Sequence, residues 1–120
     1  MCNSNDILNL LLNAGADVNI SDTYGATPLM YAIAEKFDFE IIQELIKRVI
    51  NINHSDADGL TALMAACIFS DNSDIVLYLL KCGADPKIKD AENKTAVDYI
   101  KQNPALRGSE AYSKLVFNLG

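Results

Sequence analysis

The sequence contains no tryptophan, one histidine, three prolines and three cysteines among its 120 residues. Because Cys2, Cys67 and Cys82 are odd in number and lack CxxC or Cys/His spacing, they indicate neither a disulfide framework nor a zinc site. No apolar run approaches the roughly 18 residues of a membrane span, and the polar segment 1–6 is unlike a secretory signal. We therefore expect one soluble domain in the reducing cytoplasm.

Positive charge is also scarce. Ten Lys and Arg face sixteen Asp and Glu, which gives a net charge of -6 and a sequence pI of about 4.5. Such a chain repels phosphate backbones and anionic headgroups, so nucleic acid and membranes are disfavoured as partners. A protein with a basic patch is a better candidate, although acidity also serves solubility alone.

The sequence does contain an internal repeat. Residues 20–53 match residues 54–87 at an offset of 34 without a gap, with ten identical positions, where about two are expected from composition. The same offset carries Thr27 and Thr61 onward to Thr95. A period in the thirties is typical of a solenoid, in which each unit buries its apolar face against its neighbours.

Each unit is predicted to be a turn followed by two helices. Segments 22–25 and 56–59 begin with Asp, which can bond its own downstream backbone, and end with Gly, which accepts a positive φ. Thr27 is then a helix N-cap, with Pro28 at the first helical position. Paired apolar residues four apart, as in 75–80, predict a second helix that packs on one face.

These residues resemble the ankyrin repeat family over nearly the whole chain: the phrase Asp22-x-x-Gly25-x-Thr27-Pro28-Leu29, the apolar second helix, then Gly83-Ala84-Asp85. The resemblance implies an all-α solenoid with short β-hairpin or turn fingers and a concave surface lined by the first helices. It also implies one domain over 1–120, with a half repeat at 1–19, repeats at 20–53 and 54–87, and a C-terminal capping repeat at 88–120.

The chain departs from the family pattern in two respects. Met30, Met64 and Asp98 occupy the position of a family histidine that bonds to the preceding loop, so that bond loses its usual donor. Each unit also carries one residue more than the usual family length, which we assign to the loops at 36–39 and 70–73 between the helices.

Catalysis finds little support in the sequence. No GxSxG, P-loop, GxGxxG or HExxH spacing occurs, and the one histidine, His54, falls at a repeat position that holds Ile20 and Ile88. The aspartates recur at the repeat period, which favours turn and cap roles over an acid/base pair: Asp17, Asp22, Asp56, Asp85 and Asp90. We expect a protein that is not an enzyme and has no catalytic residue, cofactor or metal ion.

The resemblance instead implies a protein-protein interaction module that binds through its concave helix face and fingers. The candidate partner contacts are residues at finger or concave positions that vary between units: Tyr24, His54, Asp58, Phe69 and Glu92. The alternative is a structural segment of a larger scaffold or a self-associating array that joins end to end. Either a fragment of a longer array or a natural cap would account for the half repeat.

Phe69 and His54 each leave two interpretations open. Glu35 and Asn103 align with Phe69, and their polarity predicts an exposed concave site where an aromatic anchor would be effective; alternatively, Phe69 folds back on the neighbouring loop. His54 is interpreted as an exposed finger residue, either a plain loop position or a partner contact.

Asn19 raises the question of a modification. Leu11 together with Asp17-Val18-Asn19 resembles the pattern that asparaginyl hydroxylases accept in ankyrin repeats. A turn role for Asn19 is the favoured interpretation, because Asn is a common turn residue.

The N-terminal half repeat generates a test. Its apolar face, residues 7, 8, 11 and 12, has no preceding first helix to cover it, and terminal solenoid units normally need a polar outer face. We expect fraying in a monomer, so that amide exchange gives residues 5–14 much lower protection than residues 74–82. Equal protection in a monomer would contradict this and favour a cap; equal protection in a dimer would favour self-association.

Overall fold

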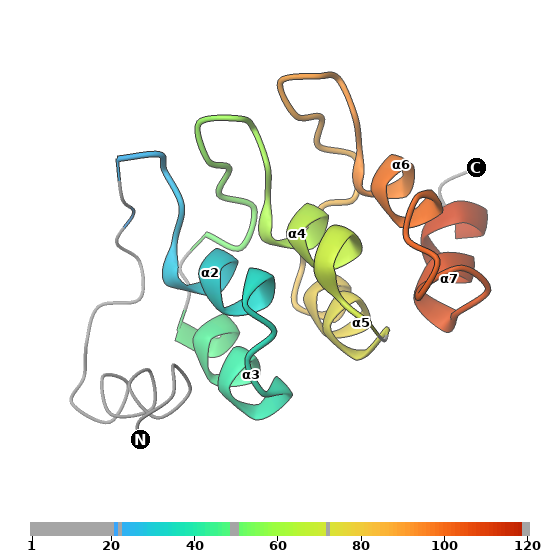
Figure 1. The fold of residues 1–120 in the computed structure, drawn as a ribbon, viewed down its shortest axis with the longest axis horizontal. Helices are drawn as coiled ribbons and strands as arrows, with labels where there is room; N and C mark the ends of the chain where they lie inside the picture. The colour runs from blue at the N-terminus through green and yellow to red at the C-terminus, as the bar shows by residue number, and fades with distance from the viewer. Residues whose placement is uncertain (1–20, 22, 49–50, 72, 119–120) are drawn as a thin grey trace.

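The computed structural model describes residues 21, 23–48, 51–71 and 73–118, without the side chains of residues 117 and 118. The predicted half repeat, with Asp17, Asn19 and the segment 5–14, lies outside these residues, as does Asp22. The described ranges form six helices in three pairs (Figure 1): α2 (Pro28–Ala34), α3 (Phe39–Arg48), α4 (Ala62–Phe69), α5 (Asp74–Lys81), α6 (Ala96–Lys101) and α7 (Glu110–Asn118).

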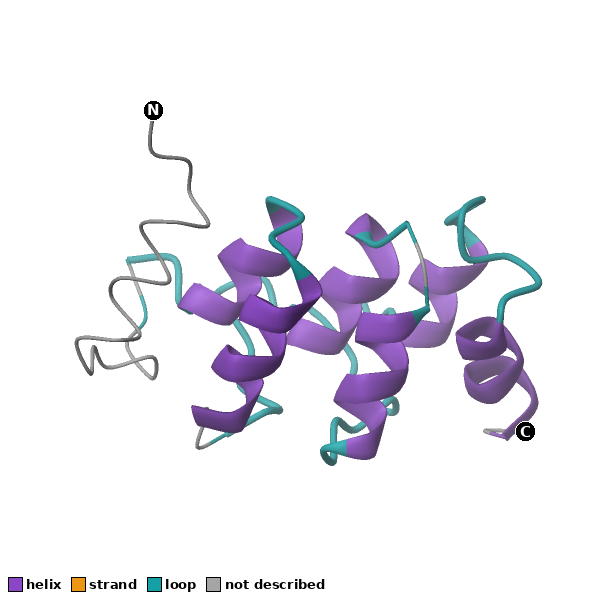
Figure 2. Cartoon of the chain, turned by 90° about the horizontal axis from the view of Figure 1, so that it is seen from below, coloured by secondary structure: helices purple, strands orange, loops and turns teal. Residues whose placement is uncertain are grey.

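The helices stack in two rows. Helices α2, α4 and α6 form the inner row beside the projecting loops, and α3, α5 and α7 form the outer row (Figure 1). Among the described residues, each helix contacts the partner in its own unit and the helix of the same row in each adjacent unit, and α2 does not contact α6. Figure 2 shows the same succession of pairs from below. The predicted all-α solenoid is confirmed.

The inner helices begin where the repeated threonines predict. The Oγ1 atoms of Thr27 and Thr61 accept hydrogen bonds from the N–H groups of Met30 and Met64 at 3.4 and 3.3 Å, which satisfies one otherwise unpaired donor at each N-terminus. In the last unit, the Asp98 carboxylate accepts from the Thr95 N–H at 2.9 Å instead. Asp98, at the family histidine position, therefore serves helix initiation.

The core runs along the stack and is most complete at α4. Residues 62–67 of α4 are all buried, because α4 packs against inner helices on both sides and against α5. Cys67 is fully buried, and desolvation raises the pKa of its thiol to about 12. The thiol therefore stays protonated at neutral pH, and Cys67 packs as a small hydrophobic side chain.

The loop preceding each inner helix forms a finger. We define the fingers by their described residues: 21 and 23–26, 55–60, and 89–94. The second is a short antiparallel hairpin with a bridge between Ser55 and Thr61 and a 2.9 Å bond from the Asp56 N–H to the Leu60 carbonyl. The predicted β-hairpin character is thus present in this finger.

The repeated aspartates hold the finger turns. Oδ1 of Asp56 accepts hydrogen bonds from the backbone N–H groups of Asp58 and Leu60 at 2.9 and 3.0 Å. Asp90 repeats this arrangement one unit later with Glu92 and Lys94, at 2.8 and 2.9 Å. The interpretation of Asp56 and Asp90 as turn residues is confirmed.

One position at the finger tips requires a left-handed backbone. Gly25, Gly59 and Asn93 occupy it with φ of 78°, 79° and 66°, and Asn tolerates this region better than most residues. Gly59 is additionally constrained, because a Cβ there would lie 2.8 Å from the Ala91 nitrogen and 2.9 Å from the Asp90 Cα. The second and third fingers can therefore stack closely only if this residue has no side chain.

A pair of glycine substitutions tests this constraint. Gly83 also has a positive φ, 102°, but a Cβ there would meet nothing within 4 Å. Gly83→Ala is expected to lower the free energy of unfolding by about 1 kcal/mol through backbone strain alone. Gly59→Ala should cost about 3 kcal/mol, because overpacking adds to the strain. Urea unfolding followed by circular dichroism measures both, and equal losses would refute the close-approach argument.

Candidate functional site

Backbone hydrogen bonds join consecutive fingers. The Ala57 N–H donates to the Tyr24 carbonyl at 2.8 Å, and the Ala91 N–H donates to the Asp58 carbonyl at 2.9 Å. Tyr24, Asp58 and Glu92 share one repeat position, and all three are exposed, Tyr24 to 73%. Three of the predicted contact residues therefore form a row along coupled finger tips.

His54 provides another link between fingers. The residue is half-buried, and its Nε2 lies 2.8 Å from the Gly25 carbonyl oxygen. Since a carbonyl only accepts, Nε2 must carry the proton. The expectation of an exposed loop residue is therefore wrong, because the ring reaches across to the preceding finger. A histidine thus bonds to the preceding loop although Met30, Met64 and Asp98 occupy the family position for this role.

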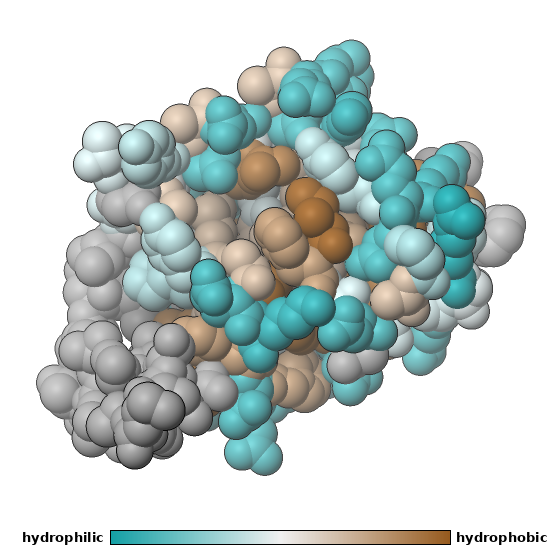
Figure 3. Space-filling view, in the orientation of Figure 1, coloured by the Kyte–Doolittle hydropathy of each residue, from teal (hydrophilic) through white to brown (hydrophobic). Residues whose placement is uncertain are grey.

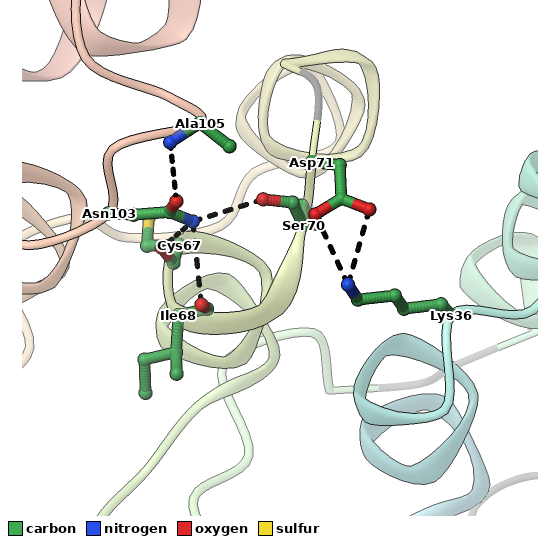
Figure 4. Close-up of polar contacts among 7 residues, drawn as sticks. All are labelled: Lys36, Cys67, Ile68, Ser70, Asp71, Asn103 and Ala105. Atoms are coloured by element: carbon green, nitrogen blue, oxygen red, sulfur yellow. Dashed lines mark hydrogen bonds and ion pairs between the residues drawn. The ribbon is translucent and has the colours of Figure 1, made fainter.

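Asn103 also differs from its predicted placement. It is half-buried, and its amide nitrogen lies 3.0, 3.4 and 3.0 Å from the carbonyl oxygens of Cys67, Ile68 and Ser70 (Figure 4). These carbonyls belong to the end of α4, where the last turn lacks intrahelical donors. Its polarity therefore reflects helix capping by the next unit. The predicted exposure of this repeat position is confirmed for Glu35 and Phe69 but is wrong for Asn103.

The expected loops between the helices supply a polar link between the first two described units. Lys36 Nζ lies 3.1 Å from Oδ1 of Asp71, and both side chains are more than half exposed (Figure 4). Such an exposed pair contributes little to stability. At this end of the units, the hydrogen bonds of the half-buried Asn103 therefore contribute more to stability than the Lys36–Asp71 pair does.

A groove opens between α2 and α4 at the base of the second finger. Its volume is about 160 Å³, and two of its walls are the aromatic rings of Tyr31 and Phe69, which are 50% and 41% exposed. Figure 3 shows apolar surface gathered over α4 and surrounded by hydrophilic side chains. We call this feature the α2–α4 groove and define it by its lining: Ala26, Met30, Tyr31, Ala34, Asp56, Leu60, Thr61, Ala65 and Phe69.

The groove exists because one repeat position changes size. Tyr31, Ala65 and Tyr99 are aligned at the 34-residue offset, so the middle inner helix carries a methyl group where the others carry a phenol. In the last unit the Tyr99 hydroxyl donates a hydrogen bond to Oδ2 of Asp90. At the corresponding position beside Asp56, α4 contributes only the Ala65 methyl group, and both residues line the groove.

The Tyr99–Asp90 pair has marked electrostatic consequences. The hydrogen bond to Asp90, with help from burial and neighbouring carboxylates, raises the pKa of Tyr99 to about 12. The same bond, together with backbone N–H donors, lowers the pKa of Asp90. The pair is therefore held as a neutral phenol and an ionised carboxylate across the physiological pH range.

Phe69 was predicted as a candidate partner contact on the concave side, and it lines the groove between the inner helices α2 and α4. Tyr31 and Ala65 were not predicted. The signal was present in the repeat itself, since an alanine between two aligned tyrosines indicates missing volume on one face. The sequence alone does not show that this position faces the space between the inner helices.

The described residues offer little for other chemistries. They contain no group of three or more His, Cys, Asp or Glu side chains that could hold a metal ion. None of the helices in these ranges has the length and apolar character needed to cross a membrane. Among the residues lining the α2–α4 groove, Asp56 carries the one carboxylate and there is no basic side chain.

Comparison with known proteins gives one match. A family model described as ankyrin repeats, in three copies, matches residues 1–90. The matched segment includes the link between Ala57 and Tyr24 and every residue that lines the α2–α4 groove, whereas Ala91, the donor of the second link, lies just beyond it. A comparison with curated proteins finds no match.

The Tyr99–Asp90 bond predicts how stability depends on pH. Because the folded pKa of Tyr99, about 12, exceeds the unfolded value of about 10, the bond stabilises the fold fully below pH 10 and is lost as pH rises toward 12. Tyr99→Phe should therefore destabilise the protein at pH 8 and progressively less above pH 10. Urea unfolding of both proteins across this range measures the difference, and a constant difference up to pH 12 would contradict the assignment.

Proposed function

This chain belongs to the ankyrin repeat family, whose members are generally protein-protein interaction modules, and from that premise we propose that it binds a partner protein without catalysing a reaction. The partner contacts the concave surface, formed by the inner helices α2, α4 and α6 and the fingers. This surface is distinct from the outer helices, whose apolar side chains stabilise the stack.

The α2–α4 groove is the observation that carries the proposal. The large exposed apolar side chains among the described residues are Tyr24, Tyr31 and Phe69, and two of these three line the groove. Exposed aromatic rings beside a concave apolar surface favour binding, because they bury large areas and lose few rotamers on contact. A surface serving only solubility would gain nothing from them.

The finger tips supply the remaining contacts of the proposed surface. Tyr24, Asp58 and Glu92 lie on fingers whose backbones are bonded to one another, so their positions are fixed before binding, which lowers the entropic cost of association. We assign His54 a supporting role, because its ring holds the Gly25 carbonyl. The exposed carboxylates of Asp58 and Glu92 favour a partner with a basic patch.

The alternative function is a structural one, as a scaffold segment or an end-to-end array. It predicts contacts through the ends of the stack, whereas the groove and the finger row lie along its side. Sedimentation over a range of concentrations separates the two, because concentration-dependent growth that survives changes in the groove favours the structural role.

Two substitutions test the interaction surface. The full chain is immobilised, a captured partner is identified by mass spectrometry, and purified partner is titrated by calorimetry. Phe69→Ala and Tyr24→Ala are each expected to weaken binding by about 2 kcal/mol, because truncating an aromatic anchor removes buried area.

Ser113→Ala on α7 is the matched control, since this residue is exposed on the outer row and should leave affinity unchanged. Circular dichroism checks that all variants are folded. If neither aromatic substitution changes affinity by more than about 0.5 kcal/mol, the partner binds elsewhere and the surface assignment is wrong.

A further inference from the structure

We infer that the α2–α4 groove is a socket for a tyrosine side chain of the partner, whose hydroxyl donates a hydrogen bond to the Asp56 carboxylate. The inference rests on the proposed function and specifies what the groove receives. It follows from a comparison of the groove with the next unit of the same chain.

The third unit provides the template. There, Tyr99 extends from α6 to the third finger, its hydroxyl bonds Oδ2 of Asp90, and Lys94 Nζ lies 5.9 Å from the ring centroid. One repeat earlier, the same positions hold Ala65, Asp56 and Leu60, and all three line the groove. The groove is therefore the site that a tyrosine fills in the next unit, with the tyrosine removed.

Asp56 retains the acceptor that such a tyrosine needs. Its Oδ1 accepts from the Asp58 and Leu60 N–H groups, as Oδ1 of Asp90 does in the third finger. Within the described part of the chain, the side-chain bonds of Asp56 all go to Oδ1, whereas Asp90 also uses Oδ2 for Tyr99. Oδ2 of Asp56 is thus available to a donor that enters the groove.

The lining selects a ring that carries a hydroxyl. Met30, Ala34 and Ala65 present apolar surface, and Tyr31 and Phe69 present rings, which together favour a flat aromatic group. A lysine or arginine entering this apolar space would lose hydration of its charge. A phenol combines an apolar body with one polar tip, which matches a groove with one carboxylate.

Charge on the surrounding surface favours basic residues beside the tyrosine. Glu35 follows the groove residue Ala34 on α2, and Asp58 lies between Asp56 and Leu60 on the second finger; both Glu35 and Asp58 are exposed. Lys36 is bonded to Asp71 at 3.1 Å. The partner segment is therefore a tyrosine flanked by Lys or Arg, which these carboxylates attract.

Three synthetic peptides serve as probes for the isotope-labelled full chain. Acetyl-Lys-Gly-Tyr-Gly-Lys-amide is titrated while amide chemical shifts are followed by NMR, alongside peptides with Phe or Ala at the centre. Shifts are expected at residues 30–34, 56–60 and 65–69. The Phe peptide should bind about tenfold more weakly than the Tyr peptide, because it loses a hydrogen bond to a charged acceptor. The Ala peptide should show no saturable binding.

Two variants test the site itself. Ala65→Tyr introduces the residue of the neighbouring units. This variant should fold, and its tyrosine ring should occupy the groove and abolish Tyr-peptide binding. Ser113→Tyr adds the same side chain on the exposed outer face of α7 and should leave binding unchanged. Asp56→Asn keeps the Oδ1 acceptor for the turn, replaces Oδ2 with an amide, and should reduce the preference for Tyr over Phe to about twofold or less.

The outcomes separate the socket from the wider proposal. Equal affinities for the Tyr and Phe peptides, shifts outside the groove, or unchanged Tyr-peptide binding by Ala65→Tyr would each overturn the socket. If Ala65→Tyr fails to fold, the Asp56→Asn comparison decides the question. An identified partner whose affinity falls in Phe69→Ala but not in Ala65→Tyr would retain the interaction surface and reject the socket.

Discussion

Close stacking of consecutive fingers is the constraint on which the rest of the structure depends. Each link is a backbone hydrogen bond, from Ala57 to Tyr24 and from Ala91 to Asp58, and it requires the backbones to approach so closely that Gly59 has no room for a Cβ. This contact fixes the spacing of the units, and with it the spacing of the inner helices. The volume between two inner helices is then set by their side chains, and one small residue opens a groove.

The repeat position of Ala65 illustrates how a solenoid acquires a function without changing its framework. At that position Tyr99 joins α6 to the third finger through its bond to Asp90. Ala65 cannot form such a bond, and its small side chain leaves the apolar α2–α4 groove open. The second finger keeps its shape, because Oδ1 of Asp56 still holds the turn. Framework and surface thus depend on different atoms of the same aspartate.

The units are also joined at the end away from the fingers. The Asn103 amide caps α4 from the following unit, and Lys36 reaches Asp71 across the preceding pair of loops. The finger bonds and the Asn103 cap lie at opposite ends of α4 and together resist rotation of one unit against the next, whereas the exposed Lys36–Asp71 pair adds little. A surface assembled from several units, such as the finger row and the groove, consequently keeps its geometry before a partner arrives.

The sequence by itself determined the local structure, because turns and caps depend on residues only a few positions apart. Thr27 and Thr61 begin their helices, Asp56 and Asp90 hold their turns, and the period alone indicated a solenoid. The tertiary structure decided what each variable position faces, since that depends on packing between units about 34 residues apart. Only in the folded stack does His54 contact the Gly25 carbonyl and Asn103 cap the end of α4. In the same way, the small side chain of Ala65 leaves a groove between two rings only once the inner helices are packed.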